Sequence, residues 1–136
     1  HVYDFYKELV FKNKKKLFIL GDGMQKKSYL DVKDCITAIL ISTKKSKEKI
    51  NTFNLGCDDY INVKKSAKII SKKLNLNPKF IFAGGKTGWI GDQPFVYLST
   101  KKIKKLGWKN RVSIEDSIIK TVNWLSNNKW VFKIRK

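Results

Sequence analysis

The sequence is poor in several residue types on which particular chemistries depend. Its 136 residues include one histidine, His1, so a Ser-His-Asp triad and a histidine-rich metal site are excluded within this chain. The two cysteines, Cys35 and Cys57, match no zinc-binding spacing and make no disulfide framework, so we expect the reduced, buried thiols of a cytoplasmic protein. No apolar run approaches the ~18 residues of a membrane span, so we expect no membrane partner.

Arginine is also scarce, although the chain is strongly basic. Lysine and arginine number 30 against 11 acidic residues, a net charge of +19, yet Arg111 and Arg135 are the only arginines. Proteins that bind phosphates or recognise bases often use the planar guanidinium group of arginine. The lysines of this chain are also spread along its whole length. We interpret the charge mainly as a bias toward lysine and expect no specific nucleic-acid partner. A stand-alone basic nucleic-acid-binding module is the alternative interpretation.

The length and composition of the chain suit one domain or part of one. Hydrophobic residues make up 42% of the chain, enough for a buried core. The first residue is His1 and the only methionine is Met24. Because translation starts at methionine, we expect this chain to be a segment of a longer protein.

Apolar residues recur at helical spacing in several segments, and residues that favour helix boundaries flank them. Asp31, Asn62 and Ser113 are good N-caps, while Asn77-Pro78 and Gly107 are good stops. Short apolar runs bounded by glycine predict strands. The sequence therefore predicts an α/β fold. The expected helices cover about 2–10, 32–42, 63–74, 100–106 and 114–125, and the expected extended segments cover 17–20, 28–30, 52–56 and 79–82.

Two sequence patterns look like catalytic motifs but are weak evidence for catalysis by this chain. The segment "GGKTG", residues 84–88, lacks the earlier glycine of a phosphate-binding loop, because Phe80 stands there, and "GWIGDQP" cannot begin the helix that such a loop requires. A tyrosine followed four residues later by lysine occurs at Tyr3, Tyr29, Tyr60 and Tyr97, in a chain dominated by lysine. We therefore assign no catalytic residue and no metal ligand to this chain.

Four segments that together cover nearly the whole chain carry a resemblance to a known family. They are "LFILGDGMQKKSYLDVKDCITAI", "FNLGCDDYINVKKSAKIISKKL", "GWIGDQPFVYLSTKKIKKLGW" and "SIEDSIIKTVNWL". In this order they resemble NAD-dependent epimerase/dehydratase proteins, the extended short-chain dehydrogenases/reductases that act on nucleotide sugars, UDP-glucose 4-epimerase among them. Each segment alone is moderately specific, whereas four in the family's order are a strong signal.

The resemblance implies that residues 1–136 are the C-terminal part of such an enzyme, mainly its substrate-binding domain, with about 31–56 contributing to the upstream Rossmann domain. The family's glycine-rich loop, its catalytic serine or threonine and its Tyr-x-x-x-Lys pair lie upstream. The resemblance thus implies NAD bound mainly by that missing region, a nucleoside-diphosphate sugar as substrate, and a parent protein that is a homodimer. We expect the 136-residue chain alone to be inactive.

The resemblance also implies roles for residues near the first glycines. Phe18, Ile19 and Leu20 match the strand whose backbone lies against the nucleobase. Lys27 matches an arginine that contacts the sugar-nucleotide diphosphate, and Tyr29 stands beside it.

This sequence departs from the family at the diphosphate positions. Lys27 is a point charge, which cannot reproduce the two-pronged contact of an arginine. Trp89 stands where many family members have a second diphosphate arginine, and it carries no charge. Lys86, in the adjacent turn, is our candidate for the missing charge.

Overall fold

The structure, a computed structural model, describes residues 1–93 and 95–134. Its helices are α1 (Val2–Lys7), the π-helical continuation η1 (Glu8–Lys12), α2 (Val32–Lys45), α3 (Val63–Lys73), α4 (Lys101–Lys104), α5 (Ile114–Asn127) and α6 (Val131–Ile134). Its strands are β1 (Lys16–Ile19), β2 (Lys26–Lys27), β3 (Ile61–Asn62), β4 (Lys79–Phe82) and β5 (Phe95–Val96). This mixture of helices and strands confirms the predicted α/β class.

The strands form two small sheets. β1 and β4 pair in parallel, with Leu17 opposite Phe80 and Ile19 opposite Phe82. In the second sheet β2 lies in the middle, antiparallel to β3 and parallel to β5. An isolated antiparallel bridge between Gly21 and Gly84 lies just beyond the ends of β1 and β4.

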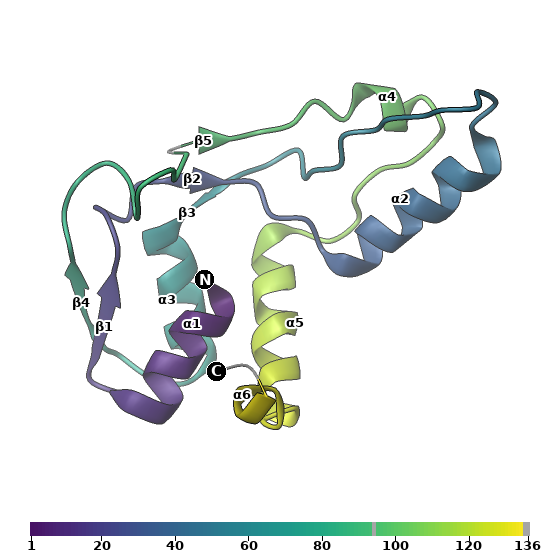
Figure 1. Ribbon diagram of the computed structural model, residues 1–136. Helices are drawn as coiled ribbons and strands as arrows, with labels where there is room; N and C mark the ends of the chain where they lie inside the picture. The colour runs from purple at the N-terminus through teal and green to yellow at the C-terminus, as the bar shows by residue number, and fades with distance from the viewer. Residues whose placement is uncertain (94, 135–136) are drawn as a thin grey trace.

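One lobe of the molecule holds the main core. Helices α1, α3 and α5 lie side by side next to the β1–β4 pair, while α6 lies at the far end of α5 (Figure 1). The predicted apolar stripes of these helices face one another, because a helix of this spacing can bury a single face. The buried residues of this core are Phe5, Tyr6, Leu9, Leu17, Ile19, Cys57, Ile61, Ala67, Ile70, Ile114, Ile118, Val122 and Leu125.

A second lobe extends from the first as an arm made of α2, α4 and the segments that join them (Figure 1). Its small core contains Ala38, Ile103 and Trp108. Asp34 of α2, which is 4% exposed, connects this arm to the segment before α5. Its Oδ2 accepts hydrogen bonds from the backbone N–H groups of Arg111 (2.8 Å) and Val112 (3.0 Å), and its backbone carbonyl accepts one from Trp108 Nε1.

The predicted N-caps are confirmed. Side-chain oxygens of Asp31, Asn62 and Ser113 accept hydrogen bonds from backbone N–H groups in the first turns of α2, α3 and α5, at 2.9, 2.7 and 3.0 Å respectively. Each bond satisfies a donor that has no partner within the helix, which is why these residues start helices. Gly107, with a φ of 89°, ends the turn after α4 as expected.

Three predicted elements differ from the structure. The segment 52–56 forms no strand, because a strand needs a ladder partner and none of the described residues pairs with it. The extended piece predicted at 28–30 lies earlier, at Lys26–Lys27, where β3 and β5 provide partners. α3 ends at Lys73, before the predicted stop, because Asn75 adopts a left-handed φ of 55°.

Three short elements were not predicted, namely β3, β5 and α6. All three are too short to show a periodicity in the sequence, and β3 and β5 are defined only by their pairing with β2. The segment "GWIGDQP", residues 88–94, was expected to begin no helix, and residues 88–93 contain bends and turns, while Pro94 lies outside the described residues.

The outer face of α2 is apolar and exposed. Val32, Ile36, Ile39 and Leu40 are each more than half exposed to solvent, whereas Ala38 on the opposite face is buried. A stripe of this size on a surface helix indicates a missing contact. Among the described residues, no helix is long and apolar enough to cross a membrane.

The hydrogen bonds that Asp34 accepts lead to a prediction about stability. Replacing Asp34 with alanine removes the charged acceptor of two partly buried backbone N–H groups, so we expect a loss of about 2–4 kcal/mol in the free energy of unfolding. Urea denaturation followed by circular dichroism measures this loss. Glu48→Ala, which removes an exposed carboxylate elsewhere on the arm, should stay within about 0.5 kcal/mol of the wild type. A similarly small effect of Asp34→Ala would contradict the proposed connection.

Candidate functional site

A cavity of about 470 Å³ lies between α1, β1, β2 and the loop at residues 88–92. We call it the β1–β2 cavity. Its volume is typical of sites for small molecules. Its walls combine apolar side chains with a few charged ones, contributed by His1, Asp4, Phe5, Glu8, Phe18, Leu20, Gln25, Lys27, Tyr29, Val63, Gly88, Trp89 and Asp92.

The alternation of side chains along β1 forms one wall of the cavity. Successive residues of a strand point to opposite faces. Leu17 and Ile19 are therefore buried in the core, while Phe18 and Leu20 are 58% and 62% exposed and line the cavity. The backbone of this strand separates the core of the first lobe from the cavity.

A tight turn leads the chain from β1 to β2. Gly21 and Gly23 both have φ values near 75°, which only glycine adopts without strain. A Cβ atom at Gly21 would also lie 2.0 Å from Gln25 Nε2, which donates a hydrogen bond to the carbonyl of Leu20. These two glycines therefore allow the sharp change of direction between β1 and β2.

Lys27 and Asp92 form an ion pair across the cavity wall. Lys27 Nζ lies 2.6 Å from Asp92 Oδ1, and it also donates a hydrogen bond to the carbonyl of Gln93. Asp92 Oδ2 accepts a 2.9 Å hydrogen bond from the backbone N–H of Gly88. The contact with Lys27 and the amide of Gly88 hold the pKa of the Asp92 carboxyl below its usual value. The pair thus connects β2 with the loop at 88–92.

Tyr29 lies next to this pair, where it is partly shielded from water. Burial and the nearby Asp92 carboxylate raise the pKa of its hydroxyl to about 12. Its ring stacks on that of His1, with 4.6 Å between the centroids. At neutral pH the Tyr29 side chain is therefore an uncharged hydrogen-bond donor and acceptor at the cavity wall.

The structure brings most of the predicted site residues together. Phe18, Leu20, Lys27, Tyr29 and Trp89 all line the β1–β2 cavity.

The other two predicted site residues lie elsewhere. The side chain of Ile19 is in the core, so only its backbone is available to the cavity. Lys86 is exposed to solvent and is not among the lining residues.

Sequence reasoning missed the partner of Lys27. Asp92 lies 65 residues away in the chain, within the "GWIGDQP" segment, in which a site role was expected for Trp89 alone. The Gly-Asp pair in that segment was the available signal. Gln25 and the residues of α1 that line the cavity carried no signal of their own, because their approach depends on the tertiary fold.

Comparisons with known proteins connect this arrangement to one family. No family model matches the sequence. The chain is 31% identical over 114 residues to the trifunctional UDP-glucose 4,6-dehydratase/UDP-4-keto-6-deoxy-D-glucose 3,5-epimerase/UDP-4-keto-L-rhamnose-reductase of Arabidopsis thaliana, a match covering 81% of this chain and 16% of the relative. It is 26% identical over 123 residues to the dTDP-D-glucose 4,6-dehydratase of Mus musculus, covering 88% of this chain and 34% of that protein.

Solved structures agree with these relatives. A UDP-galactose 4-epimerase superposes with a TM-score of 0.80 at 28% identity, over 95% of this chain and 41% of its own. The UDP-glucose 4-epimerase of Thermotoga maritima, solved with UDP-glucose, has the same fold, with a TM-score of 0.80 at 23% identity over 94% of this chain and 40% of its own. The chain belongs to the NAD-dependent epimerase/dehydratase family and corresponds to the C-terminal part of these proteins.

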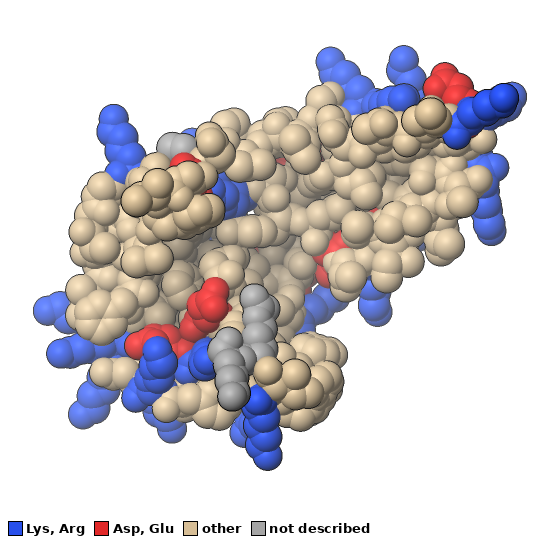
Figure 2. Space-filling model, in the orientation of Figure 1, with Lys and Arg blue, Asp and Glu red and all other residues tan. Residues whose placement is uncertain are grey.

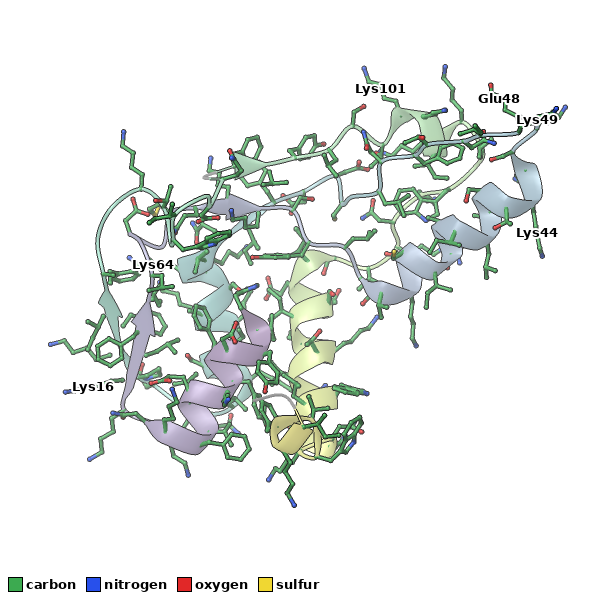
Figure 3. The ribbon with its side chains drawn as sticks, viewed as in Figure 1. Lys16, Lys44, Glu48, Lys49, Lys64 and Lys101 are labelled. Atoms are coloured by element: carbon green, nitrogen blue, oxygen red, sulfur yellow. The ribbon has the colours of Figure 1, made fainter. Side chains whose placement is uncertain are left out.

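The surface and the comparisons give no support to the alternative of a nucleic-acid-binding module. On the face drawn in Figure 2, lysine and arginine side chains lie around the outline and do not gather into one stripe. Lys16, Lys44, Lys49 and Lys101 extend outward from different elements at opposite ends of the molecule (Figure 3). Binding along a nucleic-acid backbone favours a continuous basic groove or patch.

The Lys27–Asp92 pair generates a prediction about pKa values. In the variant Lys27→Met we expect the pKa of the Asp92 carboxyl to rise toward its usual value, because the ammonium is the main cause of its depression. Carboxyl-selective NMR titration of Asp92 in wild type and variant measures the change. The depressed pKa stabilises the fold above the pKa of the unfolded chain, and this contribution is lost as pH falls through the folded value. An unchanged pKa in the variant would rule out the ion pair.

Proposed function

We propose that the chain is the nucleotide-sugar-binding part of an NAD-dependent epimerase or dehydratase whose substrate is a nucleoside-diphosphate sugar. The observation that carries the proposal is that Phe18, Leu20, Lys27, Tyr29 and Trp89, chosen from family motifs far apart in the sequence, line one cavity. The chain spans 16% to 34% of the length of the two curated relatives described above, so the activity of the whole protein is part of the proposal.

Each wall of the cavity suits a different part of such a ligand. Phe18 and Leu20 offer exposed apolar surface beside the backbone of β1, where a nucleobase can lie flat and reach backbone groups. Lys27 is the ammonium available to a phosphate, and Tyr29 provides a neutral hydroxyl. The role proposed for the cavity is to bind and orient the substrate, while the upstream region supplies the groups for proton and hydride transfer.

The described residues do not fit NAD. A dinucleotide phosphate rests on a glycine-rich turn at a helix N-terminus, and the glycine-rich segment 84–88 leads into no helix. We propose that an upstream domain binds NAD and packs against the exposed face of α2, with the unpaired segment 52–55 joining its sheet. We further propose that residues 31–56 belong to that Rossmann domain, and that the parent protein is a cytoplasmic homodimer.

The first test of this proposal uses the 136-residue chain itself. We expect neither micromolar NAD binding nor turnover of UDP-glucose, since the family resemblance places the glycine-rich loop and the catalytic Tyr-x-x-x-Lys pair upstream of these residues. Titration calorimetry with NAD measures the first, and chromatography of UDP-glucose incubated with chain and NAD measures the second. Micromolar NAD binding by the chain would contradict the proposal that an upstream domain binds NAD.

The second test replaces Lys27 with alanine in the full-length protein. We expect KM for the nucleotide sugar to rise and kcat to change little. The expected loss in binding is about 1.5–3 kcal/mol, because the variant removes the cation and also leaves the Asp92 carboxylate unpaired beside the diphosphate. A cation next to a remote diphosphate interacts equally with ground and transition states, so its loss affects binding alone. Lys64→Ala, which removes an exposed lysine outside the cavity lining, is the matched control. An unchanged KM in Lys27→Ala would exclude a phosphate contact.

A further inference from the structure

We propose that Asp92 sets the specificity of the β1–β2 cavity by competing with the ligand's phosphates for Lys27, so that affinity rests mainly on the nucleoside. This inference rests on the proposed function and deepens it. It concerns a residue of this chain that the sequence motifs did not single out, and it makes an unusual prediction: removing a charged group from the binding site strengthens binding of the diphosphate.

The ammonium of Lys27 already has two acceptors. Asp92 Oδ1 lies 2.6 Å from Nζ, and the carbonyl of Gln93 accepts a second hydrogen bond from the same atom. The side chains of Lys27 and Asp92 are only 18% and 11% exposed, so water screens their attraction weakly. A phosphate that binds Lys27 must therefore weaken contacts already made, and only the difference between the two arrangements contributes to affinity.

The position of Asp92 is fixed from its other side. Its Oδ2 accepts a 2.9 Å hydrogen bond from the backbone N–H of Gly88, which itself lines the cavity. The carboxylate is thus tied to the loop and cannot simply swing away when a ligand enters. A phosphate next to Lys27 would lie close to this negative charge, and like charges at short distance repel.

The other charged groups of the cavity do not offset Asp92, because they are already paired. Asp4 and Glu8 of the first helical segment also line the cavity. Asp4 lies 3.4 Å from the N-terminal ammonium of His1, and Glu8 forms an ion pair with Lys12 at 3.0 Å. Lys27 is the only lysine or arginine among the described lining residues, and three carboxylates surround the same space. A protein with a net charge of +19 therefore has a binding cavity in which acidic side chains outnumber basic ones.

Apolar contacts can supply the affinity that the phosphates do not. Trp89 is 65% exposed, and Phe18 and Leu20 are similarly exposed at the same cavity. Burying such surfaces against a nucleobase is favourable, since aromatic and aliphatic groups gain about 25 cal/mol for each Å² removed from water. A cavity with these walls and one partly neutralised cation favours the nucleoside over the diphosphate.

The test compares ligands and variants in the full-length protein by titration calorimetry. The probes are uridine, UMP, UDP and UDP-glucose. Asp92→Asn keeps an acceptor for the Gly88 amide and removes the charge, so we expect UDP to bind at least fivefold more tightly and uridine to change less than twofold. Asp58→Asn removes the carboxylate of another 2.6 Å lysine–aspartate pair, outside the cavity lining, and controls for the change in net charge. We expect no effect in this control.

A measurement on the wild-type protein tests the inference even if the Asp92→Asn variant does not fold. We expect UDP to bind less than tenfold more tightly than uridine at low salt, because Lys27 is already paired. A larger ratio, or an Asp92→Asn variant that folds and binds UDP no better than the wild type, overturns the inference while leaving the proposed function in place. Failure of the wild type to bind both uridine and UDP-glucose overturns the proposed function, and this inference with it.

Discussion

The parallel pairing of β1 with β4 is the constraint on which the remaining structure depends. It holds β1 in a register in which Leu17 and Ile19 enter the core between the helices, and this orientation turns Phe18 and Leu20 toward the β1–β2 cavity. The same pairing brings Gly21 next to Gly84, so the turn after β1 and the loop after β4 start from neighbouring points. This arrangement places the loop at 88–92 where it forms one side of the cavity. A shift of one residue in the pairing would exchange the two faces of β1.

The electrostatics of the cavity differ from what the family resemblance implies. Two arginines are expected at the diphosphate, whereas this chain has Lys27 and Trp89. The structure shows in addition that Lys27 is paired with Asp92. The fold of the family is retained while the residues at the expected diphosphate positions carry less charge, which illustrates that fold and binding preference are separable properties. Function has to be argued from the side chains in the cavity.

Much of the fold could be predicted from local sequence. The stripe of Ile114, Ile118, Val122 and Leu125 specifies which face of α5 is buried, and Ser113 starts that helix because its hydroxyl satisfies a free backbone donor. Strands that depend on pairing with a distant segment were harder to predict from the sequence. β5 exists only because β2 lies next to it, and the apolar segment at 52–56 forms no strand because a suitable partner is missing among the described residues.

The sequence by itself determined the helices, their caps, the sharp turn at Gly21 and Gly23, and the family to which the chain belongs. These features depend on residues close together in the chain or on the order of motifs along it. Only the tertiary structure decided which candidate residues share a cavity, that Lys86 lies outside it, and that Asp92 neutralises Lys27 from 65 residues away. The physical reason is that electrostatic contacts depend on distance in space, and that distance is set by how β1, β2 and the loop at 88–92 pack together.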